Sequence, residues 1–499
     1  MELEEEQNMS LLAKKATVPP ADQVQDLLIA GRAVPGDGPP LRVVNPATGA
    51  LLGRVGTSSP AQVAEAIAAG HEAERRTGWS RLPPHERARI LSRAADEIER
   101  QADHLAVLQM SENGKTRKES HAQAMSAAGI FRYYAAVCEC SEEAMPPARG
   151  DYYTMQVYEP VGVVAALTPW NSPLTMGAQK IAPALAAGNA VVLKAAETTS
   201  FVTLALGQCV VEAGLPEGLL SVLAGGRETA VALVEDPGIG LISFTGGTAT
   251  GQSIARGAAD RLVPMILELG GKSPHIVFAD ADLEEAARSV ASGIFGGTGQ
   301  SCVAGSRLFV QASVADRFRA LLIEAAGAMR LGPPSDPASV IGPLSSFAHR
   351  ERVESFVKAG VASGGEILFG GQRPEGEVFA EGAYFEPTII GGLDNSAAIA
   401  QEEIFGPVLC FMTFEDEADL VGAANDSDFG LAAGIWTESY RRAWRVARAL
   451  EAGTVWINTY KQLSIAAPFG GFKLSGQGRE KGLQGMRAYQ QMKSLYWAV

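Results

Sequence analysis

Residues 241–251 have the sequence LISFTGGTATG, and this stretch is the clearest indicator of the fold class. An apolar run typical of a buried strand is followed by two glycines and then by the start of a helix. Such a unit can present backbone N–H groups and the positive end of a helix dipole to a phosphate. Thr248 replaces the second glycine of the usual dinucleotide fingerprint. Taken alone, the stretch is therefore more often a plain turn between a strand and a helix than a nucleotide site.

The chain on either side of this stretch repeats the same alternation. Short apolar runs at 162–167, 190–193 and 220–223 are separated by segments with helical spacing, and a second alternation begins at 275–278. Buried strands that alternate with helices predict an α/β fold with a parallel sheet. The 499 residues exceed what one hydrophobic core usually organises, so we expect two or three domains.

Composition and charge exclude several classes of function. Hydrophobic residues make up 46% of the chain and charged residues 20%, which is ordinary for a soluble globular protein. The formal net charge of −14 argues against a nucleic-acid partner and against docking on an anionic membrane. No apolar run approaches the roughly 20 residues that a membrane helix needs.

The cysteines and the N-terminus bear on the compartment. The count of five cysteines is odd and shows no framework spacing, which fits a reducing environment. Cys138 and Cys140 lack a second pair, so we expect no metal site. Residues 1–24 are polar, begin with several glutamates unlike a secretory leader, and are expected to form a loose arm. We therefore expect a cytoplasmic protein.

A thiol and a carboxylate carry the strongest chemical signal. Cys302 lies in the glycine-rich segment GQSCVAGSR (299–307), and Glu268 lies 34 positions earlier (302 − 268) in LELGGK (267–272). Cysteine is the most nucleophilic common side chain, and a carboxylate among apolar neighbours tends to have a raised pKa that suits a general base. Each residue alone has an ordinary alternative, a core thiol and a surface glutamate. No histidine is close in sequence to Cys302, so a Cys–His hydrolase lacks local support.

Two further motifs lie where predicted strands end. TPWNSP (168–173) contains Asn171, whose neutral amide suits an oxyanion, although an Asx turn is the more common role of such a string. VLKAAE (192–197) places Lys194 and Glu197 where α/β sheets bind ligands, and both could hydrogen-bond a ribose; the alternative is a solvated pair.

Two later segments are weak signals by themselves. QEEIFGP (401–407) offers Glu403 to a sugar hydroxyl, and PFGGFKLSG (468–476) is a glycine-rich loop with two aromatic residues. The order and spacing of all these motifs together are highly specific. From about residue 40 to the C-terminus the chain resembles the NAD(P)-dependent aldehyde dehydrogenase superfamily, most closely at 267–272 and 299–307.

The resemblance implies catalytic roles. Cys302 would be the nucleophile and Glu268 the base that activates water. Asn171 would bind the oxyanion together with the backbone N–H of Cys302. Lys180 and Glu480 match residues implicated in a proton relay. The implied reaction is the oxidation of an aldehyde to its carboxylic acid through a thiohemiacetal and a thioester on Cys302.

The resemblance also implies a cofactor site and a substrate pocket. NAD is expected, with NADP possible, although Glu197 would repel a 2′-phosphate. The residues implied at the cofactor site are Thr168, Pro169, Trp170, Lys194, Glu197, Gly225, Gly226, Gly246, Gly247, Thr248, Leu269, Gly270, Glu403 and Phe405. Those implied at the pocket are Ser172, Met176, Gln179, Ser301, Val303, Leu463 and Phe469. Ser172, Gln179 and Leu463 stand where bulky aromatics can occur in relatives, so we expect an open, partly polar funnel for aromatic, cyclic or hydroxylated aldehydes.

The family fold implies three parts beyond the N-terminal arm. They are a Rossmann-type NAD-binding domain (25–144 and 161–271), an α/β catalytic domain (272–474) and a β-hairpin oligomerisation arm (145–160 and 475–499). A homodimer or homotetramer is expected. Two rivals remain: a non-catalytic scaffold, which intact Cys302 and Glu268 disfavour, and a hydrolase or CoA-acylating enzyme that forms a thioester, whose acylating version Glu268 disfavours.

Overall fold

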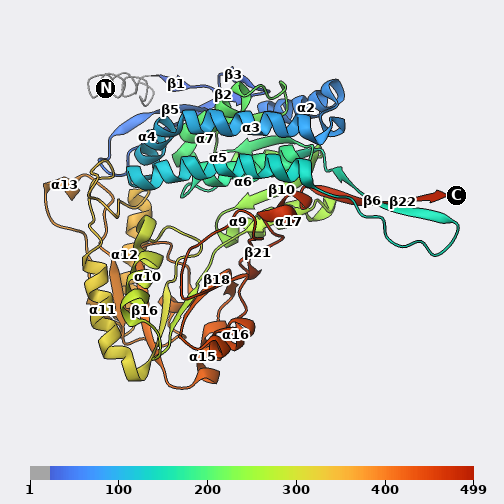
Figure 1. The fold of residues 1–499 in the computed structure, drawn as a ribbon. Coiled ribbons are helices and arrows are strands. Elements are labelled where there is room, and N and C mark those ends of the chain that lie inside the picture. Colours follow the sequence, from blue (N-terminus) through green and yellow to red (C-terminus); the bar gives the residue numbers. More distant parts are fainter. Residues whose placement is uncertain (1–22) are drawn as a thin grey trace, which may run out of the picture.

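The computed structural model describes residues 23–499, which form two α/β bodies, each built on its own sheet (Figure 1). The predicted arm, residues 1–24, lies outside the described residues except for its last two positions. The first body contains a sheet of eight strands and the second a sheet of seven. This arrangement confirms the predicted α/β fold class.

The first sheet is parallel at its centre. Its strand order is β21-β11-β10-β7-β8-β9-β2-β3, and the five central strands all run in parallel. The central strands are β7 (Val163–Leu167), β8 (Ala190–Lys194), β9 (Leu220–Leu223), β10 (Ile239–Thr245) and β11 (Met265–Glu268). The antiparallel edge strands are β2 (Leu27–Ile29), β3 (Arg32–Val34) and β21 (Gly476–Gln477). Since the chain order reverses between β7 and β10, the connections diverge there and open a crevice at the carboxyl ends of the strands.

Helices cover both faces of this sheet. Right-handed crossovers place the helices after β7 and β8 on one face and those before and after β10 on the other. The first face carries α6 (Pro173–Ala186) and α7 (Ser200–Glu212), backed by α3 (Pro84–Arg100), α4 (Ala102–Asn113) and α5 (Arg117–Cys140). The second carries α2 (Pro60–Thr77), α8 (Arg227–Glu235) and α9 (Thr248–Ala258). Capping boxes at Ser59 and Thr116 fix where α2 and α5 begin.

A small separate sheet contains β1 (Val24–Gln25), β5 (Leu51–Thr57) and β4 (Gly38–Val44).

The second sheet is parallel apart from its first strand. In order it contains β14 (Glu366–Phe369), β15 (Thr388–Gly391), β16 (Val408–Phe414), β13 (Arg307–Gln311), β12 (Pro274–Val277), β18 (Ala432–Trp436) and β19 (Thr454–Ile457). One face is covered by α10 (Leu283–Phe295) and α11 (Ala315–Gly327). The other is covered by α12 (Phe347–Ala362), α14 (Ala398–Gln401), α15 (Glu417–Asn425) and α16 (Tyr440–Ala449). Shorter elements are α13 (Glu377–Ala380) and the paired strands β17 (Phe429–Gly430) and β20 (Phe472–Lys473).

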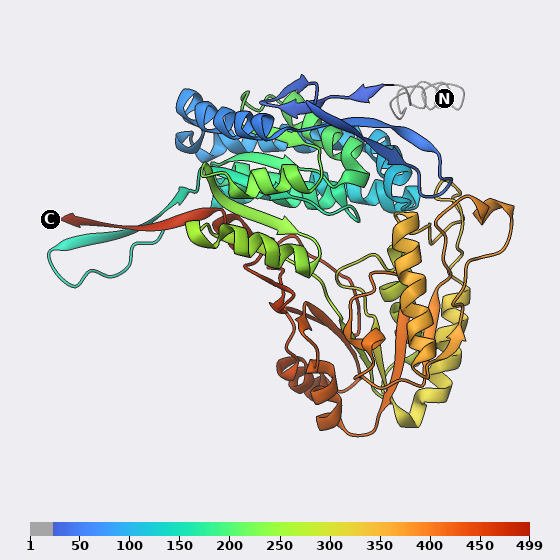
Figure 2. The ribbon, with the colours of Figure 1, turned by 180° about the vertical axis from the view of Figure 1, so that it is seen from behind.

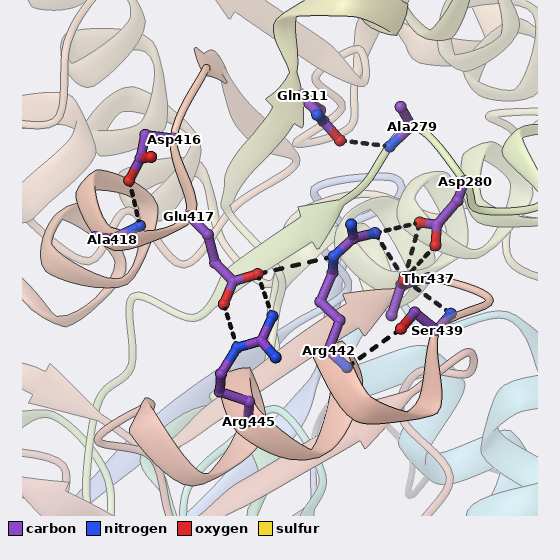
Figure 3. A network of polar contacts seen from close by, with 10 residues as sticks. All are labelled: Ala279, Asp280, Gln311, Asp416, Glu417, Ala418, Thr437, Ser439, Arg442 and Arg445. Atoms are coloured by element: carbon purple, nitrogen blue, oxygen red, sulfur yellow. Dashed lines mark hydrogen bonds and ion pairs between the residues drawn. The ribbon is translucent and has the colours of Figure 1, made fainter.

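A polar network orients α16 on the second body (Figure 3). Arg442 donates to Asp280 at 2.8 Å and to Thr437 at 3.3 Å, and its guanidinium lies 4.6 Å from the ring centre of Phe278. Arg445 pairs with Glu417 of α15 at 2.7 Å. Each exposed ion pair stabilises the fold by only about 0–1 kcal/mol. Together, however, they join α15 and α16 to the ends of β12 and β18.

A two-stranded ribbon projects from the first body (Figures 1 and 2). β6 (Tyr152–Pro160) and β22 (Gln490–Ala498) pair antiparallel along their whole lengths. The second part of the predicted arm begins at position 475, whereas the second strand of the ribbon begins at Gln490. β21 belongs to the first sheet, and α17 (Gly482–Arg487) packs against α6. The chain therefore returns to the first body between β21 and α17, and it carries the buried side chain of Glu480 there.

The aromatic side chains near the C-terminus differ in exposure. Tyr489 is 1% exposed, because its hydroxyl is hydrogen-bonded inside the first body, whereas Tyr496 and Trp497 are 71% and 73% exposed. Cys140 is exposed at the end of α5, whereas Cys138 on the same helix is buried. Among residues 23–499, no helix combines the length and apolar character needed to cross a membrane.

Candidate functional site

A cavity of about 820 Å³ lies between the two bodies. One side is formed by the carboxyl ends of β7, β10 and β11, which is the crevice expected where the strand order reverses. The other side is formed by the turn at residues 301–303 and by residues 401–405 and 463–469. The cavity therefore joins the motifs of both bodies at one place.

The backbone before Cys302 fixes the position of the thiol. Gly297, Thr298 and Gly299 have φ angles of 66°, 60° and 70°, which belong to the left-handed region. A Cβ at Gly299 would lie 2.1 Å from the carbonyl oxygen of Gly406, so only glycine fits there. A Cβ at Gly271 would lie 2.4 Å from the carbonyl oxygen of Cys302. The thiol thus stands on a tight turn held by close backbone contacts.

The surroundings of Cys302 favour the protonated thiol. Burial, together with the nearby carboxylates of Glu268 and Glu403, raises its pKa to about 12, while Lys481 acts in the opposite direction. A base or a bound cation at the cavity would therefore be needed to form the thiolate at neutral pH.

Glu268 ends β11 and is buried, and neither of its carboxylate oxygens has a hydrogen-bond partner among residues 23–499. Burial and the charge of Glu480 raise its pKa well above the ordinary value. A Cβ at Gly470 would lie 2.9 Å from Oε1 of Glu268, so this glycine leaves room for the carboxylate. A carboxylate with a raised pKa accepts a proton readily near neutral pH, as a general base requires.

Asn171 links the two bodies beside the thiol. It follows β7, and its Nδ2 donates a hydrogen bond of 2.9 Å to the carbonyl oxygen of Gln300. The side chain of Gln300 is itself fixed, because its Oε1 accepts from the backbone N–H of Ser345 at 2.8 Å. Neutral amide donors held in this way can stabilise negative charge that develops on a reacting oxygen.

Lys180 and Glu480 form a buried ion pair below the cavity. Lys180 Nζ lies 2.8 Å from Glu480 Oε1, and both side chains are almost fully buried. Glu480 lines the cavity and Lys180 does not. The structure thus brings four of the five residues with predicted catalytic roles to the cavity wall, and it places Lys180 against one of them.

Most residues implied at the cofactor site also line the cavity. They are Pro169, Trp170, Gly246, Gly247, Thr248, Leu269, Gly270, Glu403 and Phe405. The ring centres of Trp170 and Phe405 are 5.3 Å apart, and Oε1 of Glu403 accepts from the N–H of Gly271 at 2.9 Å. A Cβ at Gly270 would lie 2.4 Å from the carboxylate of Glu403, which explains the glycine.

The remaining cofactor candidates lie along the same edge of the sheet. Thr168 is buried, and its hydroxyl donates to the carbonyl of Lys194 at 3.4 Å. Lys194 pairs with Glu197 at 3.1 Å at the end of β8, and Gly225 and Gly226 follow β9, which is the next strand. These groups continue the row of strand ends that begins at the cavity.

The start of α9 fits an anionic group. Gly247 is the N-cap of this helix of 11 residues and provides no side-chain cap, and a Cβ added there would meet open space. The first N–H groups of α9 therefore open toward the cavity, as a pyrophosphate site requires. Together with the polar groups at the ends of β8 and β9, this arrangement fits a dinucleotide.

All seven residues implied at the substrate pocket line the cavity. They are Ser172, Met176, Gln179, Ser301, Val303, Leu463 and Phe469. Gln179 is 3% exposed, and its amide makes none of the hydrogen bonds found among residues 23–499. Ser172 occupies the N-cap of α6 without capping it, and its hydroxyl instead accepts from Nε2 of Gln123 at 3.1 Å. The Oε1 of Gln123 is buried without a partner, so this wall offers unpaired polar atoms.

The structure adds cavity residues that sequence reasoning missed. They include Gln123, Thr175, His349, Arg352, Gln401, Glu402, Asp428, Phe429 and Lys481. The ring of His349 lies 5.3 Å from that of Trp170, although 179 positions separate them (349 − 170). Gln401 and Glu402 belong to the segment 401–407 singled out above, and Lys481 and Thr175 adjoin the predicted site residues Glu480 and Met176; the others had no local signal. Among the described residues, no group of three His, Cys, Asp or Glu side chains is placed to hold a metal ion.

Comparisons with known proteins agree with this arrangement. A sequence model described as "Aldehyde dehydrogenase family" matches residues 34–495. One relative is the (Z)-2-((N-methylformamido)methylene)-5-hydroxybutyrolactone dehydrogenase of Acinetobacter baylyi, which is 40% identical over 91% of this chain and 93% of its own. Another is a betaine aldehyde dehydrogenase of Agrobacterium fabrum, 40% identical over 92% of this chain and 93% of its own.

A solved structure is similar over nearly the whole chain. The betaine aldehyde dehydrogenase of Staphylococcus aureus, in complex with NAD+, superposes with a TM-score of 0.94 at 35% identity, covering 98% of this chain and 97% of that one.

Proposed function

The chain belongs to the aldehyde dehydrogenase family, and from this premise we propose that it oxidises an aldehyde to its carboxylic acid with NAD, using Cys302 as nucleophile and Glu268 as base. The observation that carries the proposal is the meeting of the Cys302 thiol, the unpartnered carboxylate of Glu268 and the amide of Asn171 at one cavity. The three side chains come from different motifs and match the needs of covalent acyl chemistry.

The first step is addition of the thiolate to the aldehyde. The sulfur of Cys302 bonds to the carbonyl carbon, and the carbonyl oxygen becomes an oxyanion. The amide of Asn171 and the backbone N–H of Cys302 bind that oxygen, and loss of such a donor typically costs about 2.7–4 kcal/mol of barrier stabilisation. NAD bound at the crevice would supply the hydride acceptor.

The second step releases the acid. The acyl group remains on Cys302 as a thioester, and Glu268 removes a proton from a water whose oxygen attacks the thioester carbon. The carbon–sulfur bond then breaks, the carboxylic acid leaves, and the thiolate is recovered. The raised pKa of Glu268 supports its role, since a stronger base removes the proton more easily.

We propose a preference for NAD over NADP. Glu197, paired with Lys194 at the end of β8, would accept hydrogen bonds from a ribose diol, whereas its charge would repel a 2′-phosphate. The half-exposed position of Glu197 leaves it free to turn toward a ligand.

We propose an uncharged aldehyde that is aromatic, cyclic or hydroxylated. The unpaired amide of Gln179 and the Gln123–Ser172 pair would hydrogen-bond a polar group of such a substrate, while Met176, Val303 and Phe469 provide an apolar surface. Relatives named betaine aldehyde dehydrogenase act on a quaternary ammonium compound. Such cations are held by several aromatic faces. Here Trp170, Phe405 and His349 pack on one another. Among the described residues of the cavity wall, this leaves Phe429 and Phe469 as the aromatic rings that could face such a cation.

We propose that the protein assembles as a homodimer or homotetramer through the β6–β22 ribbon. Its exposed Tyr496 and Trp497 support this, because exposed aromatics on a projecting element are typical of interfaces. The five free cysteines support a reducing compartment such as the cytoplasm.

The test is NADH formation with a panel of aliphatic, aromatic, hydroxylated and quaternary ammonium aldehydes, with NAD and NADP in parallel. We expect the wild-type protein to form NADH with at least one aldehyde and the Cys302→Ala variant to form none. Absence of NADH with every aldehyde, or full turnover by Cys302→Ala, would contradict the proposal.

A further inference from the structure

A chain of hydrogen bonds runs from the buried ion pair to the base of the ribbon. Lys180 Nζ donates to Glu480 Oε1 at 2.8 Å and to Ser243 Oγ at 3.0 Å. The hydroxyl of Ser243, on the central strand β10, lies 3.0 Å from the hydroxyl of Tyr489, the residue that precedes β22. All four side chains are at most 2% exposed. The lysine is therefore connected on one side to the cavity and on the other to two hydroxyl groups.

Hydroxyl groups have a property that this position requires. An ammonium group only donates hydrogen bonds, whereas a neutral amine also has a lone pair that accepts one. When Lys180 is charged, Ser243 accepts from it and donates its own hydrogen to Tyr489. When Lys180 is neutral, both bonds can reverse, so that Tyr489 donates to Ser243 and Ser243 donates to the amine. The two hydroxyls of Ser243 and Tyr489 can thus form hydrogen bonds with either proton state of a buried lysine, and no polar atom is left unpaired.

The charges around Lys180 connect it to the base. The ionisable groups around the Lys180–Glu480 pair are Glu268 of β11, Arg479 and Lys481 of the 478–481 turn, Tyr134 of α5 and Tyr489. Glu480 raises the pKa of Glu268, and Lys180 lowers it. The proton affinity of Glu268 therefore depends on the charge state of the Lys180–Glu480 pair.

We infer that Ser243 and Tyr489 are positioning residues that hold Lys180 in both of its proton states, so that the Lys180–Glu480 pair can receive the proton which Glu268 takes from water and release it again. This inference rests on the proposed function. The proton balances: it leaves the attacking water, resides on Glu268 and passes to the ion pair while the carbon–sulfur bond breaks. Neither hydroxyl contacts the substrate, and both act through Lys180.

The hydroxyl of Tyr489 is not needed to place the residue. Its backbone carbonyl already accepts from Asn189 Nδ2 at 2.9 Å, and its ring belongs to the core of the first body. Tyr489→Phe removes one oxygen and keeps these contacts. Ser243→Ala removes the other hydroxyl of the same hydrogen-bond chain and changes a smaller side chain. It therefore serves as the test if Tyr489→Phe folds poorly. Tyr384→Phe is the matched control, because Tyr384 is an equally buried tyrosine far along the chain, in the core segment 383–385.

The experiment uses para-nitrophenyl acetate, which acylates a thiol without any cofactor. The full-length protein and its variants are compared for the burst of nitrophenolate, which reports acylation of Cys302, and for the steady state, which reports release of acetate. We expect an unchanged burst and a steady-state rate lowered about fivefold to tenfold, the effect of one buried hydrogen bond. Because the charge of Lys180 lowers the pKa of Glu268, weaker support for that charge should move the rising limb of the steady-state pH profile, which reports Glu268, to higher pH. Tyr384→Phe should change neither.

Two results would overturn the inference. One is a Tyr489→Phe or Ser243→Ala protein whose steady-state pH profile matches the wild type. The other is a double variant of Tyr489→Phe and Ser243→Ala in which the rate losses of the two single variants add as free energies. The two hydroxyls act in series, so their effects on the steady-state rate should not be additive. A wild-type protein that hydrolyses the ester but oxidises no aldehyde would overturn the proposed function alone. One that does not hydrolyse the ester would overturn the acyl chemistry on which both depend.

Discussion

The side-chain amide of Asn171 donates a 2.9 Å hydrogen bond to the carbonyl oxygen of Gln300, two residues before Cys302. Asn171 follows a strand of the first body, and Gln300 belongs to the turn between α10 and β13 of the second. This bond therefore holds the amide and the thiol in register across the cavity. A small displacement of either body would separate them.

Asn171→Ala should lower kcat by about 10²–10³-fold, because one oxyanion donor is lost. Steady-state NADH formation measures this effect. NAD binding, followed by quenching of protein fluorescence, should remain within about twofold of the wild type, since Asn171 is assigned to the aldehyde oxygen. A variant that keeps full kcat would exclude the assignment.

Glu268→Gln should separate the two halves of the reaction. The amide cannot accept a proton from water, so the thioester forms and then persists. Rapid mixing with NAD and a good aldehyde should show a burst of about one NADH per site followed by slow turnover. If NADH instead forms at an unchanged steady rate, another group activates the water.

Alkylation of Cys302 by iodoacetamide, without cofactor, should be slow at neutral pH and accelerate as the pH rises toward about 12. Only the thiolate reacts, and burial together with negative neighbours keeps the thiol protonated. Glu268→Gln removes one of those charges, lowers the pKa of Cys302 and should speed alkylation at alkaline pH. Slower alkylation in this variant would show that Glu268 assists the thiol instead. The measurement needs a Cys140→Ser background, because Cys140 is exposed.

Glu197→Gln should weaken the discrimination between cofactors. The neutral amide still hydrogen-bonds a ribose but no longer repels a phosphate, so the ratio of kcat/KM for NAD to that for NADP should fall about tenfold or more. Glu235→Gln, on α8, is a control for loss of one negative charge. An unchanged ratio would place the adenosine ribose elsewhere.

Gln179→Leu should change the order of substrates. Loss of the amide removes hydrogen bonds to a polar substrate and adds apolar surface, so kcat/KM for hydroxylated aldehydes should fall about tenfold or more relative to unsubstituted ones. The panel of aldehydes measures this ratio, with Gln208→Leu as a control on a neighbouring helix. Equal effects on both kinds of aldehyde would show that Gln179 does not contact the substrate.

The local features of the fold could be predicted from the sequence. The apolar run predicted at 162–167 corresponds to β7 (Val163–Leu167), and the glycine turn after β10 leads into α9 as expected. These features depend on neighbouring residues, whose hydrophobic period and turn chemistry are visible in the chain. The placement of Cys302, Glu268 and Asn171 came from motif order rather than from periodicity.

Contacts between distant segments could not be predicted in the same way. Tyr489 is polar-tipped, lies near the chain end and has no local sign of burial, yet its hydroxyl reaches a serine 246 positions earlier. β21 has two residues and no strand pattern, and it is a strand only because it pairs with the edge of β11. His349 and Gln123 enter the cavity through packing of whole helices. Such placements follow from tertiary packing, which no window of sequence contains.

The projecting ribbon has a thermodynamic consequence. Two strands alone do not hold together well in water, and among the described residues the outer edge of β22 pairs with no other strand, so it offers N–H and C=O groups to one. If a second copy of the chain provides that strand, unfolding also dissociates the assembly, so the melting temperature should rise with protein concentration. Heat resistance would then be a property of the assembled particle, and dilution alone would lower it.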